Sequence, residues 1–596
     1  MREVLEQKYE KLFETYHFQR PIKTYSINAI IKNLLQDFLK TARKIAIYCN
    51  GGHTEMLMSD FIFELKEVRY IVDNYADISD RGGFHLIRDE EMEEVGIDGV
   101  IISSFKYKDS IAEWLKKNHP TIRYLNIYDK FAENGINLQS DYYYHNHPYH
   151  HYHTINSIQR EIDNLAGKDE LEQAYFSLIA KYIHIKDFLN AVKYAKKLYK
   201  ITGTEITSQL ITELENLCET EKAAAAQIVE NNVLMLCMDG LRKQDLTDIY
   251  MPKLTEIFEN SSFIFDNAYS FSTSTFESLI PVYSENGDLR TGYYKQNFIA
   301  EEDCRFLHEA KKQDRHIYFY TDMEHYIKGE GIRYSGEFQT ITEKLWNFIL
   351  DAVEEDNGLY YIHELYESHF SFSNPYTKAK LISEGTALLF DYLPQKGGKL
   401  RTDYEQQHLD ALRYLDDVVS PLIQPMRCRM IVYADHGNLI LKEDCRLKDV
   451  REAKLTCDDE WLHIAYVIRS PEMGTSRCNK LISLMSFNDI MISLLNHKTY
   501  VISEHTHIKA ARSELYNPNF RYLYKEIGRE RCLLAFETFI FMDGYKLLIF
   551  SDGIVELFLT ATEQKIDDRE LIWQFLQRIK EEITVCTLER VRIKKK

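Results

Sequence analysis

Short apolar runs that end abruptly in polar residues mark the expected strands of this sequence. The clearest is residues 430–433 (MIVY), which Ala434 separates from Asp435 and His436. A run of this length between polar residues is typical of a buried parallel strand and is too short to cross a membrane. Since ligands of open α/β sheets bind beyond the carboxyl ends of the strands, Asp435 and His436 fall where a site is expected.

The same pattern predicts an α/β domain over residues 229–500 and an antiparallel subdomain over residues 501–596. The expected strands of the α/β domain are residues 233–238, 317–320, 358–362 and 430–433, and a helix is expected at 404–422. The subdomain has apolar runs at 533–541, 545–550 and 554–559, separated by Asp-Gly pairs. Because Asp-Gly favours tight hairpin turns, we expect a three-stranded antiparallel meander, followed by an amphipathic helix at 568–582.

The first quarter of the chain predicts a smaller α/β domain. Residues 1–43 indicate two helices, and residues 44–150 then alternate strand and helix patterns, which implies a parallel sheet. The first strand runs into Gly51 and Gly52, and the second ends at Asp73. Over about residues 44–130, the sequence resembles the small Rossmann-like domains of bacterial polysaccharide-biosynthesis proteins. The resemblance implies that these three residues bind a nucleotide or sugar nucleotide, although the glycines form no full GxGxxG motif; docking or acceptor binding is the alternative.

Between the two α/β regions the composition changes twice. Residues 141–153 (DYYYHNHPYHHYH) hold five histidines among aromatic residues, which could bind metal. Pro148 interrupts them, which favours an aromatic, partly exposed connector. Residues 151–228 predict a helical linker, and residues 174–199 resemble one tetratricopeptide-type hairpin, fewer than the three or so units that a solenoid needs.

Composition narrows the function mainly by exclusion. Asp and Glu (92) outnumber Lys and Arg (73), and the net charge of −19 argues against a general nucleic-acid binder. The 10 cysteines include no CxxC pair and indicate free thiols in a reducing compartment. The N-terminus lacks the apolar core of a signal peptide, and no run approaches the ~20 residues that span a bilayer. The expected localisation is cytoplasmic, with no transmembrane segment.

Four segments of the second α/β domain carry residues suited to a metal and phosphate site. They are Asp239 after the first strand, the hydroxyl-rich stretch 270–281 (SFSTSTFESLIP), the segment from His363 to His369, and Asp435 with His436. A hard carboxylate oxygen beside an imidazole suits a divalent cation. Three of the four segments follow predicted strands, where the sheet would gather them.

In this order, the segments resemble the alkaline phosphatase and sulfatase superfamily over about residues 231–560. Thr291-Gly292-Tyr293, the helix near 404–416, Leu462-His463 and the C-terminal strands extend the resemblance. The turn that starts at Thr275 (TFESLIP) looks like the Thr-x-x-Ser-Val-Pro turn of the phosphoethanolamine transferases, with one extra residue before the proline.

The resemblance implies a role for each candidate residue. The metal ligands would be Asp239, Thr275, Asp435 and His436, around one or two zinc, manganese or magnesium ions. Thr275 would also be the nucleophile, because metal coordination can activate a hydroxyl; Thr273 or Ser272 would replace it if the register differs. The groups that act on phosphate oxygens or the leaving group would be His369 and His463. Further substrate contacts would come from His363, Arg242 and Ser278.

The nucleophile narrows the expected reaction. The hydroxyl turn contains no Cys/Ser-x-Pro-x-Arg sulfatase motif, and threonine cannot give formylglycine, so sulfate-ester hydrolysis is disfavoured. We expect transfer of a substituted phosphoryl group (phosphoethanolamine, phosphoglycerol or phosphoramidate type) to a sugar or polysaccharide acceptor through a phosphothreonine, as in capsule or O-antigen modification. The donor would be soluble and could be nucleotide-activated, because membrane helices are missing. The alternatives are a phosphodiesterase or phosphatase, a sulfatase, and a binding protein with a decayed site.

Overall fold

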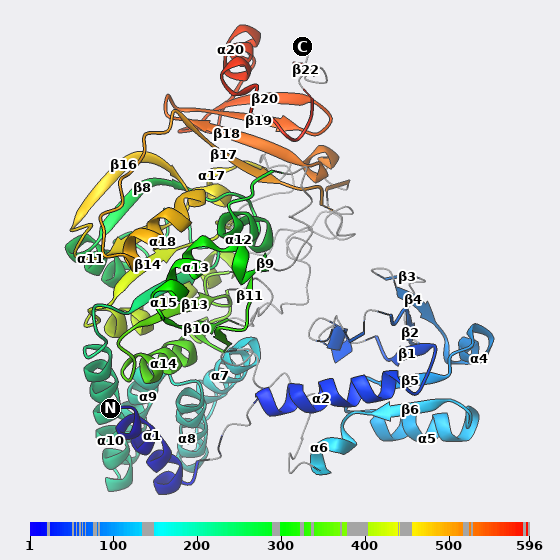
Figure 1. Cartoon of the computed structure of the whole chain (residues 1–596). Helices are drawn as coiled ribbons and strands as arrows, with labels where there is room; N and C mark the ends of the chain where they lie inside the picture. Colours follow the sequence, from blue (N-terminus) through cyan, green and yellow to red (C-terminus); the bar gives the residue numbers. More distant parts are fainter. Residues whose placement is uncertain are drawn as a thin grey trace. The chain divides into compact units, whose positions relative to one another are not determined.

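The chain of 596 residues divides into two compact units (Figure 1). The large unit comprises residues 1–20 and 152–596, and the small unit comprises residues 21–151. The computed structural model describes residues 1–18, 20, 24–50, 53, 54, 57, 58, 61, 64, 65, 67–74, 80, 81, 84–133, 148–288, 299–321, 327–334, 339–369, 372–377, 403–438, 440, 456–515, 524, 525, 528–587, 592 and 593. The two predicted N-terminal helices, α1 (Arg2–Tyr16) and α2 (Thr24–Leu39), belong to different units.

The small unit is built on one sheet with the strand order β3-β4-β2-β1-β5-β6. Its strands are β1 (Ile45–Tyr48), β2 (Tyr70–Val72), β3 (Asp80–Arg81), β4 (Phe84–Ile87), β5 (Gly99–Ile102) and β6 (Arg123–Asn126), and its helices after α2 are α4 (Met92–Val95), α5 (Lys108–Asn118) and α6 (Asp129–Glu133). All pairings are parallel except that of β3 with β4. Ile45 and Ile47 pack with α2, whereas Ala46 packs with α5, so helices cover both faces as the strand alternation requires.

The large unit is built on a mixed sheet with the order β12-β10-β13-β7-β14-β15-β8-β16. Its strands are β7 (Val233–Met238), β8 (Phe263–Tyr269), β10 (His316–Tyr320), β12 (Ile332–Tyr334), β13 (Gly358–Glu364), β14 (Arg429–Tyr433), β15 (Tyr466–Arg469) and β16 (Ser476–Ser483); a separate pair is β9 (Ile299–Ala300) with β11 (Ile327–Lys328). The central strands are parallel, but β15 runs antiparallel to β14 and β8. Every residue of β7 is buried, which explains its unbroken apolar run.

Helices pack around this sheet, and the helices of the predicted linker belong to the same unit. Those of the sheet region are α11 (Pro252–Ser261), α12 (Thr275–Ser284), α13 (Arg305–Lys312), α14 (Ile341–Ala352), α15 (Asp403–Ile423), α17 (Asp459–Leu462) and α18 (Phe487–Leu495), and those of the predicted linker are α7 (Pro148–Ile162), α8 (Lys168–His184), α9 (Phe188–Thr202) and α10 (Glu205–Ala225). Helix α1 packs on this group through Tyr9, whose ring centroid lies 5.8 Å from that of Trp346 in α14. Phe188 of α9 packs edge-to-face on the same Trp346, with ring centroids 5.3 Å apart, so the linker is part of the core of the large unit.

A second sheet, antiparallel except for the parallel pairing of β22 with β20, packs against the mixed one. Its strands are β17 (His507–Arg512), β18 (Phe536–Phe541), β19 (Tyr545–Phe550), β20 (Ile554–Leu559), β21 (Lys565–Ile566) and β22 (Arg592–Ile593), with α20 (Arg569–Ile579) on one face. The predicted meander is β18 to β20; the structure adds β17, whose mixed polar sequence hid it, and two short edge strands. The other face packs on Tyr269 and Leu462. The predicted α/β class with an antiparallel C-terminal sheet is thus confirmed.

Within the described residues, no helix combines the length and apolar character needed to cross a membrane. The nine cysteines of the described ranges are free thiols.

Candidate metal centre

The carboxyl ends of three neighbouring strands bring the predicted acids and imidazoles together. β7 lies between β13 and β14 and pairs in parallel with both, with Cys237 opposite His363 and Tyr433. Asp239 follows β7 directly, and Asp435 follows Tyr433 after one residue. Parallel strands in register therefore place His363 on the same edge as Asp239, 124 positions earlier, and Asp435 on the same edge as Gly240, 195 positions earlier.

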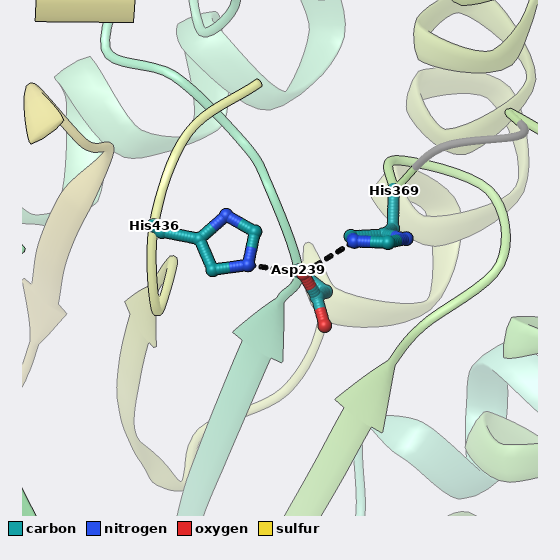
Figure 2. A group of neighbouring side chains, drawn as sticks. All are labelled: Asp239, His369 and His436. Carbon is teal, nitrogen blue, oxygen red and sulfur yellow. Dashed lines mark ion pairs between the residues drawn. The ribbon is translucent and has the colours of Figure 1, made fainter. Parts of the chain in front are cut away.

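Asp239 is the centre of this cluster. His363 Nε2 lies 3.1 Å from Asp239 Oδ2, while His436 Nε2 and His369 Nε2 lie 3.5 and 3.9 Å from Asp239 Oδ1. Both of the latter rings point toward the Asp239 carboxylate from loops that follow β14 and β13 (Figure 2). His436 Nε2 is also 3.5 Å from Asp435 Oδ2. The side chain of His369 is 27% exposed, so the cluster opens on the His369 side. The other four members are buried: Asp239, His363, Asp435 and His436.

Burial and mutual charge shape the protonation states of the cluster. Burial alone would raise the pKa of Asp239, but the His369 charge and the hydrogen bond from His363 outweigh it and hold that pKa well below its ordinary value. Burial and the neighbouring Asp239 carboxylate raise the pKa of Asp435. Burial opposes the charge on His436, yet Asp435 and Asp239 raise its pKa. The arrangement thus favours an ionised Asp239 carboxylate and a charged His436 imidazole.

Thr275 is the hydroxyl that reaches this cluster. It is the first residue of α12, and its Oγ1 donates to Asp239 Oδ2 at 3.2 Å and lies 3.3 Å from His436 Nε2. A helix N-terminus presents unpaired backbone N–H groups that attract anions. Of the alternative nucleophiles, Ser272 is buried and donates to Glu277 Oε2 at 3.3 Å instead. Thr273 is partly buried, two residues before the helix.

Other predicted contacts have different partners. The Arg242 guanidinium binds Asp245, with Nε at 2.9 Å from Oδ2 and Nη2 at 2.6 Å from Oδ1. Ser278 is buried and donates its hydroxyl to the Asp435 carbonyl at 2.6 Å, which holds the backbone of that ligand rather than facing the opening. Their predicted roles as substrate contacts remain predictions.

His463 is directed away from the acids. Its Nε2 lies 2.8 Å from the Asp266 carbonyl, and its ring stacks on Tyr269 with centroids 4.7 Å apart. Burial lowers the pKa of His463. The structure thus gives this imidazole a packing role at the edge of the sheet, and its predicted action on phosphate remains a prediction.

Residues that the sequence did not single out hold the cluster in place. The Asn438 amide donates to the carbonyls of Gly240 and Ser368 at 3.0 and 3.1 Å, and thereby ties the loops after β7, β13 and β14 together. Gly240 has φ +74°, and a Cβ there would collide with the Asn438 amide. Ser368 Oγ donates to the Asp239 carbonyl at 2.7 Å, and Lys344 Nζ donates to the His363 carbonyl at 2.7 Å. The Asp-His-Gly-Asn order was the available signal for Asn438.

The candidates of the small unit fall partly outside the described residues. Gly51 and Gly52 are outside them, as are His145 and His147 of the histidine-rich segment. Asp73 directly follows β2, and its Oδ2 accepts a hydrogen bond from the Asn50 backbone at 3.0 Å. Asp73 thus stands at the carboxyl edge of the small sheet, and its role in nucleotide binding remains a prediction.

The residues of the cluster fit a divalent cation. Within the described chain, Asp239 Oδ1 and Asp435 Oδ2 are buried carboxylate oxygens that accept no hydrogen bond, and leaving such atoms unpaired is costly. One ligand atom from each of Asp239, His369 and His436 lies within 4.8 Å of the others, and the same holds for Asp239, His363 and Asp435. Mixed oxygen and nitrogen donors accept zinc or manganese, and the carboxylates also suit magnesium.

Neither the protein-family models nor the curated proteins provide a match to this sequence. Among solved structures, phosphonate monoester hydrolase SpPMH from Silicibacter pomeroyi is similar with a TM-score of 0.42 and 14% identity, over 59% of this chain and 96% of that one. BT1596, a 2-O GAG sulfatase, gives 0.40 and 10% over 59% and 91%. The C-terminal periplasmic domain of EcEptC from Escherichia coli gives 0.33 and 13% over 48% and 90%. Likenesses at these TM-scores do not identify a family.

Proposed function

We propose that the large unit is a metal-dependent phospho-group transferase of the alkaline phosphatase and sulfatase type. It transfers a substituted phosphoryl group, of the phosphoethanolamine, phosphoglycerol or phosphoramidate type, from a donor to a hydroxyl of a sugar or polysaccharide. The observation that carries the proposal is the position of Thr275 Oγ1, within 3.3 Å of both an Asp239 oxygen and a His436 nitrogen. A hydroxyl that shares its contacts with candidate metal ligands is suited to nucleophilic catalysis.

Asp239, Asp435, His436 and His363 are the residues that would hold the cation. When bound, it supplies neutralisation of the phosphoryl oxygens and activation of the nucleophile. His369 is the partly exposed member of the cluster and serves as the proton donor to the leaving group, since general acids must reach the substrate side of a site. Asn438 and Ser368 keep the three loops in register.

The transfer takes two displacements at one phosphorus atom. Thr275 Oγ1 loses its proton to solvent and attacks phosphorus, the bond to the donor oxygen breaks, and that oxygen takes a proton from His369. The acceptor hydroxyl then gives its proton to His369 and attacks the same phosphorus. The bond to Thr275 breaks, and the threonine regains a proton from solvent. Water in place of the acceptor gives hydrolysis by the same residues.

Intact-protein mass spectrometry tests the covalent step. The metal-loaded full chain is mixed with p-nitrophenyl phosphocholine as a model donor and quenched at short times. We expect a mass gain equal to the substituted phosphoryl group, together with a burst of p-nitrophenol, and we expect Thr275→Ala to abolish both. Thr275→Ser, which keeps a hydroxyl in place, should retain the adduct.

Donor turnover that persists undiminished in Thr275→Ala, with no adduct in the wild-type chain, would overturn the proposed nucleophile. An adduct that is discharged by added methyl glycosides, with formation of the phosphodiester product, supports transfer. An adduct that is discharged only by water makes the chain a phosphodiesterase.

A further inference from the structure

The small unit contains a cavity of about 680 Å³ at the carboxyl edge of its sheet. Three of its wall segments come directly after parallel strands: residues 49 and 50 after β1, residues 73 and 74 after β2, and residues 103 and 104 after β5. β1 is central, and the chain continues from it to β2 on one side and later to β5 on the other. Such a reversal of strand order opens a crevice between the strand ends, and the volume suits a ligand of one or two rings.

One wall of the cavity is aromatic. It includes Tyr48 and Trp114, whose ring centroids lie 6.2 Å apart in an edge-to-face arrangement, and Tyr107, which is 53% exposed. An exposed large aromatic side chain beside a cavity offers a flat apolar surface to a ligand. Rings with C–H groups on one face and hydroxyls at the rim, as in pyranoses, stack on such surfaces while their polar groups stay free to hydrogen-bond.

The cavity wall also carries hydrogen-bond acceptors that are fixed in position, beginning with Asp89, whose Oδ2 accepts a hydrogen bond from the Tyr48 hydroxyl at 3.3 Å. Asp89 is buried, and its Oδ2 accepts from the Asn74 amide at 2.6 Å, while its backbone N–H donates to Asn74 Oδ1 at 3.1 Å. Asp73 stands beside them at the end of β2. Deeper in the wall, Ser103 Oγ lies 2.9 Å from His53 Nδ1. Paired, immobile carboxylates suit neighbouring hydroxyl donors, because each oxygen can accept a strong hydrogen bond.

The charge of the cavity wall restricts the class of ligand, and the backbone of the wall is strained at Cys49. Among the described residues that line the cavity, none is Lys or Arg, and two are aspartates. A phosphate group would therefore lie beside two carboxylates, whereas phosphate sites commonly use Arg or Lys. The nearby Arg88 guanidinium donates to the Asp73 carbonyl at 2.7 Å. Cys49, in the wall directly after β1, has φ +90°, a conformation that a non-glycine residue adopts only under constraint. Such strain is concentrated at functional sites.

We propose that this cavity binds an uncharged sugar ring, which stacks on Trp114 and donates its hydroxyls to Asp73 and Asp89. The small unit would then be a carbohydrate-binding unit, and the class of ligand matches the acceptor of the proposed transferase. The sugar site stands on its own cavity, so its failure would leave the proposed transfer chemistry of the large unit untouched.

Saturation-transfer NMR on the full chain tests the proposal. The probes are the methyl β-pyranosides of glucose, galactose and N-acetylglucosamine, with uridine diphosphate as the anionic comparison. We expect at least one glycoside to bind with a Kd on the order of 1 mM, which is ordinary for a single ring. Asp73→Asn and Trp114→Ala should each weaken that binding about tenfold or more, equivalent to about 1.4 kcal/mol.

Two controls separate binding from folding and from catalysis. Asp109→Asn makes the same change at an exposed position outside the cavity and should leave the signal intact, as should Thr275→Ala. Trp114→Phe retains an aromatic wall and should keep most of the affinity if Trp114→Ala proves unstable. The proposal is overturned if no glycoside binds, if binding survives both Asp73→Asn and Trp114→Ala, or if uridine diphosphate binds more tightly than every glycoside.

Discussion

The two units use the same edge of a parallel sheet in different ways. In the large unit, Asp239, His363 and Asp435 are fully buried and lie within 4.8 Å of one another. In the small unit, Asp73 and Asp89 occupy the wall of an open cavity of about 680 Å³. Strand order places polar residues at both edges, but the density and burial of charge differ. Concentrated buried charge requires a cation or protons, whereas dispersed carboxylates require only hydrogen-bond donors.

The difference indicates what would separate the proposed reactive site from the proposed binding site on one architecture. At the large edge, imidazoles lower the pKa of Asp239, so a carboxylate stays ionised where water cannot solvate it. At the small edge, Asp89 instead accepts hydrogen bonds from two neutral groups, the Asn74 amide and the Tyr48 hydroxyl. The sharpest tests therefore make the same substitution at both edges.

The largest expected effect comes from Asp435→Asn compared with Asp73→Asn. Removing one of two candidate carboxylate ligands should lower the rate of p-nitrophenol release about 1,000-fold, because the cation loses affinity and position. The same change at Asp73 should alter that rate less than about twofold, since it touches only the hydrogen bonds of the cavity. Steady-state kinetics with the model donor measure both.

Thermal unfolding completes this test. Added Mn²⁺ or Zn²⁺ should raise the Tm of the wild-type chain and of Asp73→Asn, because a ligand that binds only the folded state stabilises it. A chelator should reverse the rise, and Asp435→Asn should show neither response. If Asp435→Asn kept both its rate and its metal-dependent Tm, the large edge would not be a metal centre.

The sequence was sufficient to locate those site residues whose position follows from the backbone of the strands alone. Asp239 comes directly after one apolar run, and Asp435 and His436 follow another within three residues, so the strands that carry them could be predicted and their proximity inferred. Thr275 could be placed only through the resemblance of its turn, and the structure brings its hydroxyl to Asp239.

Side-chain direction could not be predicted. His463 follows an apolar pair, yet its ring turns to the Asp266 carbonyl, a contact between residues 197 positions apart. Arg242 has its partner Asp245 only three residues on, a pairing that the sequence does contain. The strands β8 and β16 alternate irregularly between buried and exposed positions, which hid them from a periodicity argument.

A buried acid without imidazole neighbours sharpens the comparison. Burial, together with the charge of Asp187, raises the pKa of Glu221 from its ordinary 4.5 to about 8, the opposite of the shift at Asp239. A carboxyl whose pKa is raised by folding stabilises the fold fully below pH 4.5, and this contribution is lost as the pH rises through about 8. Between pH 5 and pH 8, the free energy of unfolding of Glu221→Gln should therefore rise by roughly 3 kcal/mol relative to that of the wild-type chain.

Urea unfolding of the two chains at both pH values measures this difference. Glu219→Gln, two residues away on the exposed side of α10, is the matched control and should follow the wild-type chain. If the free energy of unfolding changed equally with pH in Glu221→Gln and in the wild-type chain, burial alone would not set the protonation of acids in this unit.

A smaller effect is expected at the amide that ties the loops. Asn438→Ala removes two hydrogen bonds to the carbonyls of Gly240 and Ser368 and should cost about 1.5 kcal/mol of stability. The rate constant kcat should fall about tenfold, because Asp239 and Asp435 would no longer be held in their relative positions. KM should change little, because the opening of the cluster on the His369 side is unaltered. Asn267→Ala, which deletes a side-chain bond to the Asn479 carbonyl far from the acids, should change neither constant. A rise in KM alone would mean that Asn438 contacts substrate.

The smallest effect decides whether Ser278 contacts substrate or only supports the site. Its hydroxyl donates to the Asp435 carbonyl at 2.6 Å and is fully buried. Ser278→Ala should therefore cost about 1 kcal/mol of stability through the lost bond, with kcat reduced only severalfold and KM changed less than about twofold. A substrate contact would instead raise KM about tenfold while the Tm stayed constant. Ser278 and Thr275 lie on the first turn of α12. The Tm and KM of this variant together therefore show whether Ser278 supports the site while Thr275 is the proposed nucleophile.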